Sequence, residues 1–544
     1  MSRSRRGSLS GLTLVVMAAT NGVAVVSAAQ SSQSPPPARA NPTATVTTVQ
    51  VRREDIFDQS DSASWIARGA NLLHVVTKPK IVDRELLIRE GQPYDSITAA
   101  ETARNLRKLG IFREVSVDSV RDSSGVVERV TTRDSWTTQP YVSFKSTGDQ
   151  VTWGVGITEK NLLGYHTKIS LRYTKDPDRS TTNLEVNVPR VLWNRVGFTG
   201  VANELSDGRN SRVTISSPFL SLSSPWSLTL DLRHNDEDVL RFFGGEDVAS
   251  DTVRHTLSKG NLNGAWAEKA SPLGFIRIGG ALQLRHEDYA KAPIPSGAES
   301  FFGEFEISAD LLRSNFLVAR EFRSLGPQED VDLSPTLHAG VWFAPKAWGY
   351  ERGGVGPNLT AHAGWDIPYG FTTFDLRGSS LFTSKGLDSG SVATQVTMAL
   401  RPVPRHSVIA NVSGGMQKNG YPGEEFDLGL SFGPRAYPIH AFTGDRAYFA
   451  SAEYRWVAMP DVLNLGLLTL GVAAFADYGG AWYDGSPRRT GKDWGVGLRF
   501  GGLRSASGKG ATRIDVARRY ANDAVTSQWV IAIGSGFAFE KIIK

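Results

Sequence analysis

The chain has 544 residues, with 60 lysines and arginines against 55 acidic residues, and it contains no cysteine. The formal charge of +5 at pH 7 brings no basic cluster with it, so the charge gives no sign of a nucleic-acid partner. The lack of cysteine excludes disulfides and thiolate metal sites, and the 55 glycines, 13 tryptophans and 25 phenylalanines suit a chain built of strands and turns.

The N-terminus has the pattern of a secretory signal peptide over residues 1–28. Three arginines among the first six residues provide the charged region, a mostly apolar stretch spans residues 12–26, and Ala28 ends a small-residue cleavage site. The alternative is an uncleaved anchor helix. Asn21 and Gly22 interrupt the apolar stretch, which favours the cleaved signal.

Residues 29–65 are predicted to be a Pro-rich linker and N-terminal segment, because three consecutive prolines begin at Pro35. No later stretch is long enough for a transmembrane helix. The best candidate, residues 465–476, has 12 residues, whereas a bilayer needs roughly 20. Only helices and closed barrels satisfy every backbone group in lipid, so a barrel is the remaining membrane option.

Residues 66–135 are expected to form a small α+β domain with the order β-α-α-β-β. Asp95 or Ser96 can cap a helix whose apolar residues recur close to the helical period until Gly110 closes it. The other expected elements are a strand at residues 72–76, a short helix at residues 83–89, a strand with Val115 and Val117 on one face, a turn at residues 121–125, and a strand with Val126 and Val130 on one face.

Residues 140–544 alternate with period two. Trp153, Val155 and Ile157 share one strand face, for example, and small or polar residues fall between them. A water-soluble sandwich would alternate as well, but here the pattern continues over about 400 residues, as a lipid-facing belt around a polar lumen requires. This predicts a mainly β chain with a transmembrane antiparallel β-barrel, and segmentation gives between 16 and 20 strands.

Segments from both regions carry a family resemblance. Residues 433–438, 444–455 and 475–479, together with residues 84–95 and 106–112, resemble the BamA/TamA outer-membrane superfamily. The resemblance implies a barrel of about 16 strands preceded by one POTRA domain at residues 66–135, which would lie in the periplasm beneath a bacterial-type outer membrane. It also implies that the POTRA domain receives client polypeptides by adding them to its sheet edge.

The resemblance further implies that a loop enters the lumen and that Arg435 reaches toward the carboxylate of Asp477. A guanidinium in a partly dehydrated lumen needs a fixed acceptor, and a forked pair to a carboxylate provides one. The alternative is that these charges are ordinary solvated lumen residues. The implied loop motif is Arg435, Ala436 and Tyr437, and the expected lumen partners are Asp477, Glu453, Arg455, Phe475 and Gly479.

Ala436 stands where the superfamily usually has glycine. A positive φ at this position would disfavour alanine by about 1 kcal/mol, because its Cβ crowds the backbone there. The substitution therefore leaves the conformation of the loop open.

A second implied site is the seam between the first and last barrel strands, which the resemblance places at residues 151–158 and 528–539. Glycines in the last strand weaken its pairing, and an exposed strand edge can template a client strand. The alternative is that the glycines only ease strand twist. The seam residues are Val151, Trp153, Val155 and Ile157 in the first strand, and Gly534, Gly536, Phe537 and Phe539 in the last.

The implied function is insertion or translocation of polypeptides at the outer membrane, without enzymatic activity, metal or other cofactor. The nine histidines are scattered without a ligand spacing, and no Gly-x-Ser-x-Gly motif occurs. Expected partners are unfolded outer-membrane or secreted polypeptides, periplasmic accessory proteins and outer-membrane lipid. The alternatives are a passive solute channel and a secretion transporter dedicated to one client.

Overall fold

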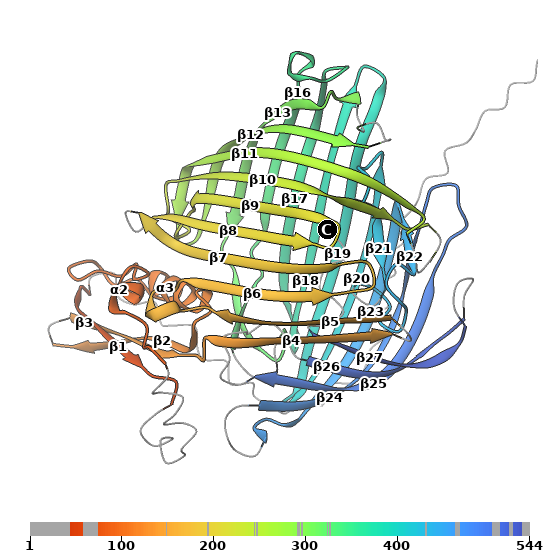
Figure 1. Cartoon of the computed structure of the whole chain (residues 1–544). Coiled ribbons are helices and arrows are strands. Elements are labelled where there is room, and N and C mark those ends of the chain that lie inside the picture. The colour runs from red at the N-terminus through yellow and green to blue at the C-terminus, as the bar shows by residue number, and fades with distance from the viewer. Residues whose placement is uncertain are drawn as a thin grey trace, which may run out of the picture. The chain divides into compact units, whose positions relative to one another are not determined.

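The protein is described by a computed structural model in which strands predominate (Figure 1). The structure describes residues 44–57, 74–123, 125–147, 150–192, 195–243, 245, 249–290, 294, 297–323, 325, 328–429, 432–462, 468–502, 512–521 and 526–535. The predicted signal peptide, residues 1–28, lies outside these ranges. None of the helices in the described part of the chain has the length and apolar character needed to cross a membrane.

A three-stranded sheet and two helices form a small N-terminal domain (red and orange in Figure 1). Its elements are β1 Val46–Glu54, α2 Pro79–Asp83, α3 Ser96–Lys108, β2 Phe112–Asp122 and β3 Gly125–Asp134. The sheet order is β1-β3-β2, with β3 parallel to β1 and antiparallel to β2. Asp95 caps α3 by accepting hydrogen bonds from the amides of Ile97 and Thr98, and Leu106 shares the buried core with Val130.

The predicted order of elements in this domain is found, but two boundaries were wrong. Residues 46–54, inside the predicted linker, form β1, whereas residues 74–76 of the predicted first strand are not in a strand. The parallel pairing of β1 with β3 joins segments far apart in the chain, and local periodicity does not reveal such a partner. The first helix begins at Pro79, whose fixed φ suits the first helical turn, and ends at Asp83, where the predicted helix begins.

Twenty strands in the described part of the chain form a closed barrel, so the predicted number of about 16 was too low. The number 16 came from the resemblance, and the irregular turn signals did not correct it. Consecutive strands pair antiparallel around the wall. The barrel strands are β4 Thr138–Thr147, β5 Gln150–Glu159, β6 Lys168–Lys175, β7 Ser180–Leu192, β8 Val196–Leu205, β9 Gly208–Ser217, β10 Trp226–Arg241, β11 Asp251–Ser271, β12 Gly274–Tyr289, β13 Phe301–Arg313, β16 Thr336–Ala344, β17 Gly354–Ile367, β18 Gly370–Thr383, β19 Gly386–Val403, β20 His406–Lys418, β23 Arg446–Met459, β24 Leu468–Trp482, β25 Gly491–Gly502, β26 Thr512–Arg519 and β27 Gln528–Ser535.

The outer face of the barrel carries exposed apolar side chains in cross-strand pairs. Val142 of β4 lies opposite Val155 of β5, and Trp266 of β11 lies opposite Ile278 of β12. Each of these four side chains is between 48% and 80% exposed. So much apolar surface on neighbouring strands is unusual in water, and it has the arrangement of a surface that contacts lipid.

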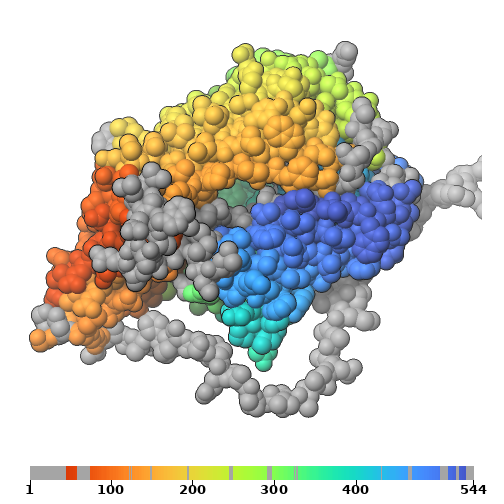
Figure 2. Space-filling model, turned by 60° about the horizontal axis from the view of Figure 1, so that its bottom comes forward, coloured from red at the N-terminus to blue at the C-terminus, as the bar shows by residue number. Residues whose placement is uncertain are grey.

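The first strand of the barrel is β4, so the seam lies between other strands than predicted. Residues 151–158, predicted as the first strand, lie in β5, which pairs with β4 on one side and β6 on the other. The error arose because the strand that precedes this segment, β4 at Thr138–Thr147, was not predicted. The last strand, β27, lies beside β4. Figure 2 shows the surface hollowed between the orange strands at the start of the barrel and the blue strands at its end.

In the described part of the chain, two inserted segments enter the lumen. The first, here called the plug hairpin, is residues 316–332 and contains β14 Phe316–Arg320 and β15 Gln328–Asp332. Its Phe322 and Leu325 form one apolar core with Phe371 of β18, Ile409 of β20 and Val457 of β23. The second, here called the lumen segment, is residues 419–445 and contains β21 Phe426–Leu428 and β22 Phe442–Gly444.

Polar contacts join the small domain to the barrel. Arg107 of α3 forms a forked pair with Asp330 of the plug hairpin, both N–O distances being 2.8 Å. Arg190 of β7 lies 2.7 Å from the carboxylate of Glu85, just after α2. The plug hairpin therefore contacts the small domain on one side and the inner wall of the barrel on the other.

Candidate functional site in the barrel lumen

The lumen segment carries Arg435, Ala436 and Tyr437 into the barrel, where all three side chains are buried. The Tyr437 hydroxyl donates a hydrogen bond of 2.7 Å to the carbonyl of Tyr520, just after β26. Its ring lies against Gly491, where any Cβ would overlap it, so glycine is required for this approach. The motif is thus fixed against the last strands of the barrel.

Ala436 does not have a positive φ, so the strain considered for alanine in place of glycine does not arise. Its amide donates a hydrogen bond of 3.0 Å to Asp493 of β25. Its methyl group packs in a small buried cluster with Phe475 and Ala517. The alanine is accommodated by ordinary packing.

Arg435 lies against Asp477 of β24. Its Nε and Nη2 donate to the two carboxylate oxygens of Asp477 at 2.7 and 3.2 Å, which is a forked pair. Its Nη1 donates to Glu453 of β23 at 2.8 Å, and its guanidinium carbon lies 3.7 Å from the centroid of the Phe475 ring. One side chain of the lumen segment is therefore held by two carboxylates and an aromatic face of the wall.

Glu453 is the centre of a larger buried network. It accepts hydrogen bonds from Arg435, from Arg455 at 2.7 Å and from Arg499 at 3.0 Å, and Arg499 also contacts Asp515 at 2.6 Å. The burial of these arginines is tolerable because each of them has a carboxylate within reach. We call this network the lumen charge cluster: Arg435, Arg455, Arg499, Arg513, Glu453, Asp477, Asp493 and Asp515.

The structure brings together Arg435, Phe475, Asp477, Glu453 and Arg455, all of which the sequence had singled out. Gly479, on the same strand as Asp477, lies at the Phe449 backbone, away from the guanidinium. Four members of the cluster were not predicted. A usable signal existed, since they alternate with small or apolar residues on the inward faces of the last strands: Asp493 and Arg499 of β25, and Arg513 and Asp515 of β26.

The predicted seam residues are not brought together. Val151, Trp153, Val155 and Ile157 lie on the exposed outer face of β5, one strand away from the seam. Gly534 is in β27 and leaves room for a barrel side chain, because a Cβ there would lie 3.0 Å from Nε of Arg513. Gly536, Phe537 and Phe539 lie outside the described residues.

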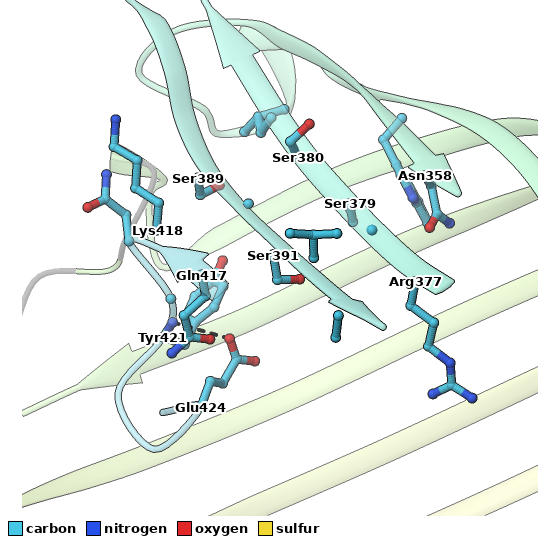
Figure 3. Close-up of a pocket in the computed structure, with 18 of the residues that line it drawn as sticks. Asn358, Arg377, Ser379, Ser380, Ser389, Ser391, Gln417, Lys418, Tyr421 and Glu424 are labelled. Atoms are coloured by element: carbon cyan, nitrogen blue, oxygen red, sulfur yellow. Dashed lines mark hydrogen bonds between the residues drawn. The ribbon is translucent and has the colours of Figure 1, made fainter. Parts of the chain in front are cut away.

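A cavity of about 790 Å³ lies between the lumen segment and the inner wall made by β17 to β20 (Figure 3). Its wall carries short polar side chains, among them Asn358, Ser379 and Ser391, and its other side includes Tyr421 and Glu424 of the lumen segment. Within the described residues, no group of three or more histidine, aspartate or glutamate side chains could hold a metal ion. The site is thus a packed charge network beside a polar cavity.

No known family profile matches the sequence, and no curated protein matches it. Solved structures to which the chain is similar include BamA from Haemophilus ducreyi lacking POTRA domains 1–3, at 11% identity and a TM-score of 0.35, covering 90% of this chain and 84% of that one. They also include CdiB from Escherichia coli, at 11% identity and a TM-score of 0.43 (90% and 76% covered). The FrpB iron transporter from Neisseria meningitidis is similar at 8% identity and a TM-score of 0.39 (78% and 88% covered).

Proposed function

We propose that this protein is an outer-membrane β-barrel that assists the insertion or translocation of polypeptides, with residues 44–134 acting as a POTRA domain in the periplasm. The observation that carries the proposal is the forked pair between Arg435 and Asp477 in the lumen. This is the contact that the resemblance to the BamA/TamA superfamily implies. The exposed apolar pairs on the outer face support a place in lipid.

The filled lumen supports a polypeptide handler over a passive channel. The lumen segment is tied to the wall through the lumen charge cluster, and the plug hairpin packs its apolar turn against three wall strands. Solute channels of this barrel type depend on an open, water-filled lumen. Because the lumen segment and the plug hairpin both fill the lumen, we favour a route for the client polypeptide that does not pass through the lumen.

The seam between β4 and β27 is the route we favour. The surface is hollowed there (Figure 2), and β27 contains Gly534, because of which its strand pairing is weaker. A strand edge that opens presents unpaired backbone groups, and these can template an incoming strand. A client barrel would extend from that edge into the membrane.

The proposal is tested by folding a small urea-unfolded barrel protein into liposomes that contain the purified protein. We expect faster folding than in empty liposomes, and we expect Arg435→Glu to lose most of the acceleration, since it places a third carboxylate beside Asp477 and Glu453. Arg405→Glu is the matched control, because Arg405 lies exposed in the turn between β19 and β20. It should accelerate folding as the wild type does.

Absence of acceleration by the wild type, together with steady ion conductance in planar bilayers, would contradict the proposal and favour the channel. Acceleration that both arginine variants retain would separate the activity from the lumen segment. To exclude a trivial loss, the folded state of Arg435→Glu is checked by circular dichroism before the assay.

A further inference from the structure

The cavity beside the lumen segment is preformed. Residues 419–425 of the lumen segment, which cover it, are anchored at both ends, since Nδ2 of Asn419 donates to the carbonyl of Asp388 at 2.6 Å and Glu425 pairs with Arg241 of β10 at 3.1 Å. A volume of about 790 Å³ is in the range of pockets that hold small ligands. A ligand would therefore meet a shaped space that does not have to be opened first.

One wall of the cavity carries a straight row of neutral polar side chains. Strand register places Asn358 of β17 opposite Ser379 of β18, Ser379 opposite Ser391 of β19, and Ser391 opposite Gln417 of β20. Figure 3 shows all four beside the cavity. Neighbouring strands lie about 4.8 Å apart, so the row presents hydrogen-bonding groups at that interval.

Most of this row is unused by the protein. Within the described residues, the side chains of Ser379, Ser391 and Gln417 make no hydrogen bond, while Asn358 donates to Glu306 at 2.9 Å. Serine hydroxyls and carboxamides both donate and accept, so they match sugar hydroxyls, which do the same. The spacing of the row is close to the length that one pyranose ring adds to an oligosaccharide.

Charges of both signs line the cavity: the acidic side chains are Glu304, Glu424, Glu425 and Asp427, and the basic ones are Arg285, Arg377 and Lys418. The acidic side chains that line it are already engaged, for example Glu304 with the Tyr350 hydroxyl, Glu425 with Arg241, and Asp427 with His440. Arg377 of β18, two residues before Ser379, makes no hydrogen bond or ion pair with any described residue, and Figure 3 shows it extending away from its strand beside the cavity. A free guanidinium next to free hydroxyls suits a carboxylate, sulfate or phosphate group.

We propose that this cavity binds an acidic saccharide. The row from Asn358 to Gln417 binds the sugar hydroxyls, and Arg377 binds the anionic substituent. The site is distinct from the lumen charge cluster and does not depend on the proposed handling of polypeptides. The same chemistry is found in soluble acidic polysaccharides and in the phosphorylated sugars of lipopolysaccharide.

The test is isothermal titration calorimetry on the full chain in detergent. The probes are a hexasaccharide of alginate, which carries carboxylates, neutral maltohexaose, hexa-aspartate and lipopolysaccharide micelles. We expect the alginate hexasaccharide to bind and Arg377→Gln to weaken it about tenfold, as the loss of one charge-assisted contact implies. Ser391→Ala, in the middle of the row, should weaken binding about threefold or more. Lys385→Gln, in the exposed turn between β18 and β19, is the matched charge control and should bind as the wild type does.

The other outcomes of the titration either support or overturn the proposed saccharide site. Equal binding of hexa-aspartate would overturn the proposal in favour of a site for acidic polypeptide. Failure of both the alginate hexasaccharide and the lipopolysaccharide to bind would leave a hydrated cavity and overturn it as well. Binding of lipopolysaccharide alone would support it and identify the membrane-borne sugar as the source. Circular dichroism melting of each variant separates lost binding from lost folding.

Discussion

At the scale of single residues, the lumen segment is held by charges that have almost no access to water. Glu453 faces Arg435, Arg455 and Arg499, and its side chain is 2% exposed. A buried carboxylate shared by several arginines is costly to assemble, but the removal of one partner costs more, on the order of 3–5 kcal/mol. Such a network specifies one arrangement of the segment and penalises the alternatives.

His440 gives this segment a pH dependence. Its Nδ1 lies 2.6 Å from Asp427 and its Nε2 2.8 Å from Asp178, while its ring stacks on Phe242 at 3.5 Å. Burial lowers the pKa of His440, but hydrogen bonds to the two carboxylates outweigh burial and raise the pKa to about 9. The imidazolium therefore anchors the segment at neutral pH.

The pKa of His440 rises on folding from about 6.5 in the unfolded chain, so the stabilisation is complete below about pH 6.5 and is lost as the pH rises through about 9. We expect the midpoint of thermal unfolding in detergent to fall over this range by more in the wild type than in His440→Gln. Above about pH 10 the difference between the two proteins should no longer change with pH. Parallel curves for the two proteins would contradict the anchoring role.

Residue-level prediction succeeded where one strand or one motif held the information. Glu453 and Arg455 share a strand face with Ser451, so their inward direction followed from the period of two. The contact between Arg435 and Asp477 needed the resemblance, because the loop that carries Arg435 has no period. The inward direction of Asp515 could have been predicted from the period of β26, but its contact with Arg499 arises only when β25 and β26 pair, and no single-strand pattern encodes that contact.

At the scale of elements, the plug hairpin is the least expected feature. Its two strands have five residues each and no apolar/polar alternation, since β14 reads Phe-Leu-Val-Ala-Arg and β15 reads Gln-Glu-Asp-Val-Asp, so no local period shows where they lie relative to the wall. The position of the hairpin is set by tertiary packing, because Phe322 and Leu325 pack against apolar residues on the inner face of β18, β20 and β23. The small domain was easier to predict, since the cap at Asp95 and the apolar period of α3 are local signals.

The plug hairpin should govern ion flow. Leu325 is 3% exposed within an apolar core, and a carboxylate there would be buried without a partner, which costs several kcal/mol. We therefore expect Leu325→Asp to displace the turn and to raise the single-channel conductance in planar bilayers. Val318→Asp is the matched control, because Val318 lies on the same hairpin but is 52% exposed. Equal conductance of both variants and the wild type would show that the hairpin does not close the lumen.

At the scale of the whole molecule, the closure between β4 and β27 is the structural basis of the proposed route. The chain has no cysteine, so an introduced pair forms the sole disulfide. Ser143 of β4 and both Val530 and Ala532 of β27 are buried on the inner side of the wall. Cysteines placed at Ser143 and at either β27 position test whether the seam must open.

We expect an oxidised seam pair to abolish the acceleration of client folding and a reductant to restore it. The matched control joins β9 to β10 through Ser216→Cys and Thr229→Cys, which lie directly opposite each other with their hydroxyls 2.7 Å apart and leave the seam free. This control should keep its activity when oxidised. Full activity of the oxidised seam variants would place the route away from the seam.

The plug hairpin also connects the small domain to the lumen charge cluster through direct contacts with both. Asp330 is clamped by Arg107 of α3, and on the same hairpin the carbonyl of Phe322 accepts a hydrogen bond of 2.7 Å from Arg455, which in turn contacts Glu453. A force that displaces the small domain would therefore be transmitted to the lumen charge cluster through the plug hairpin.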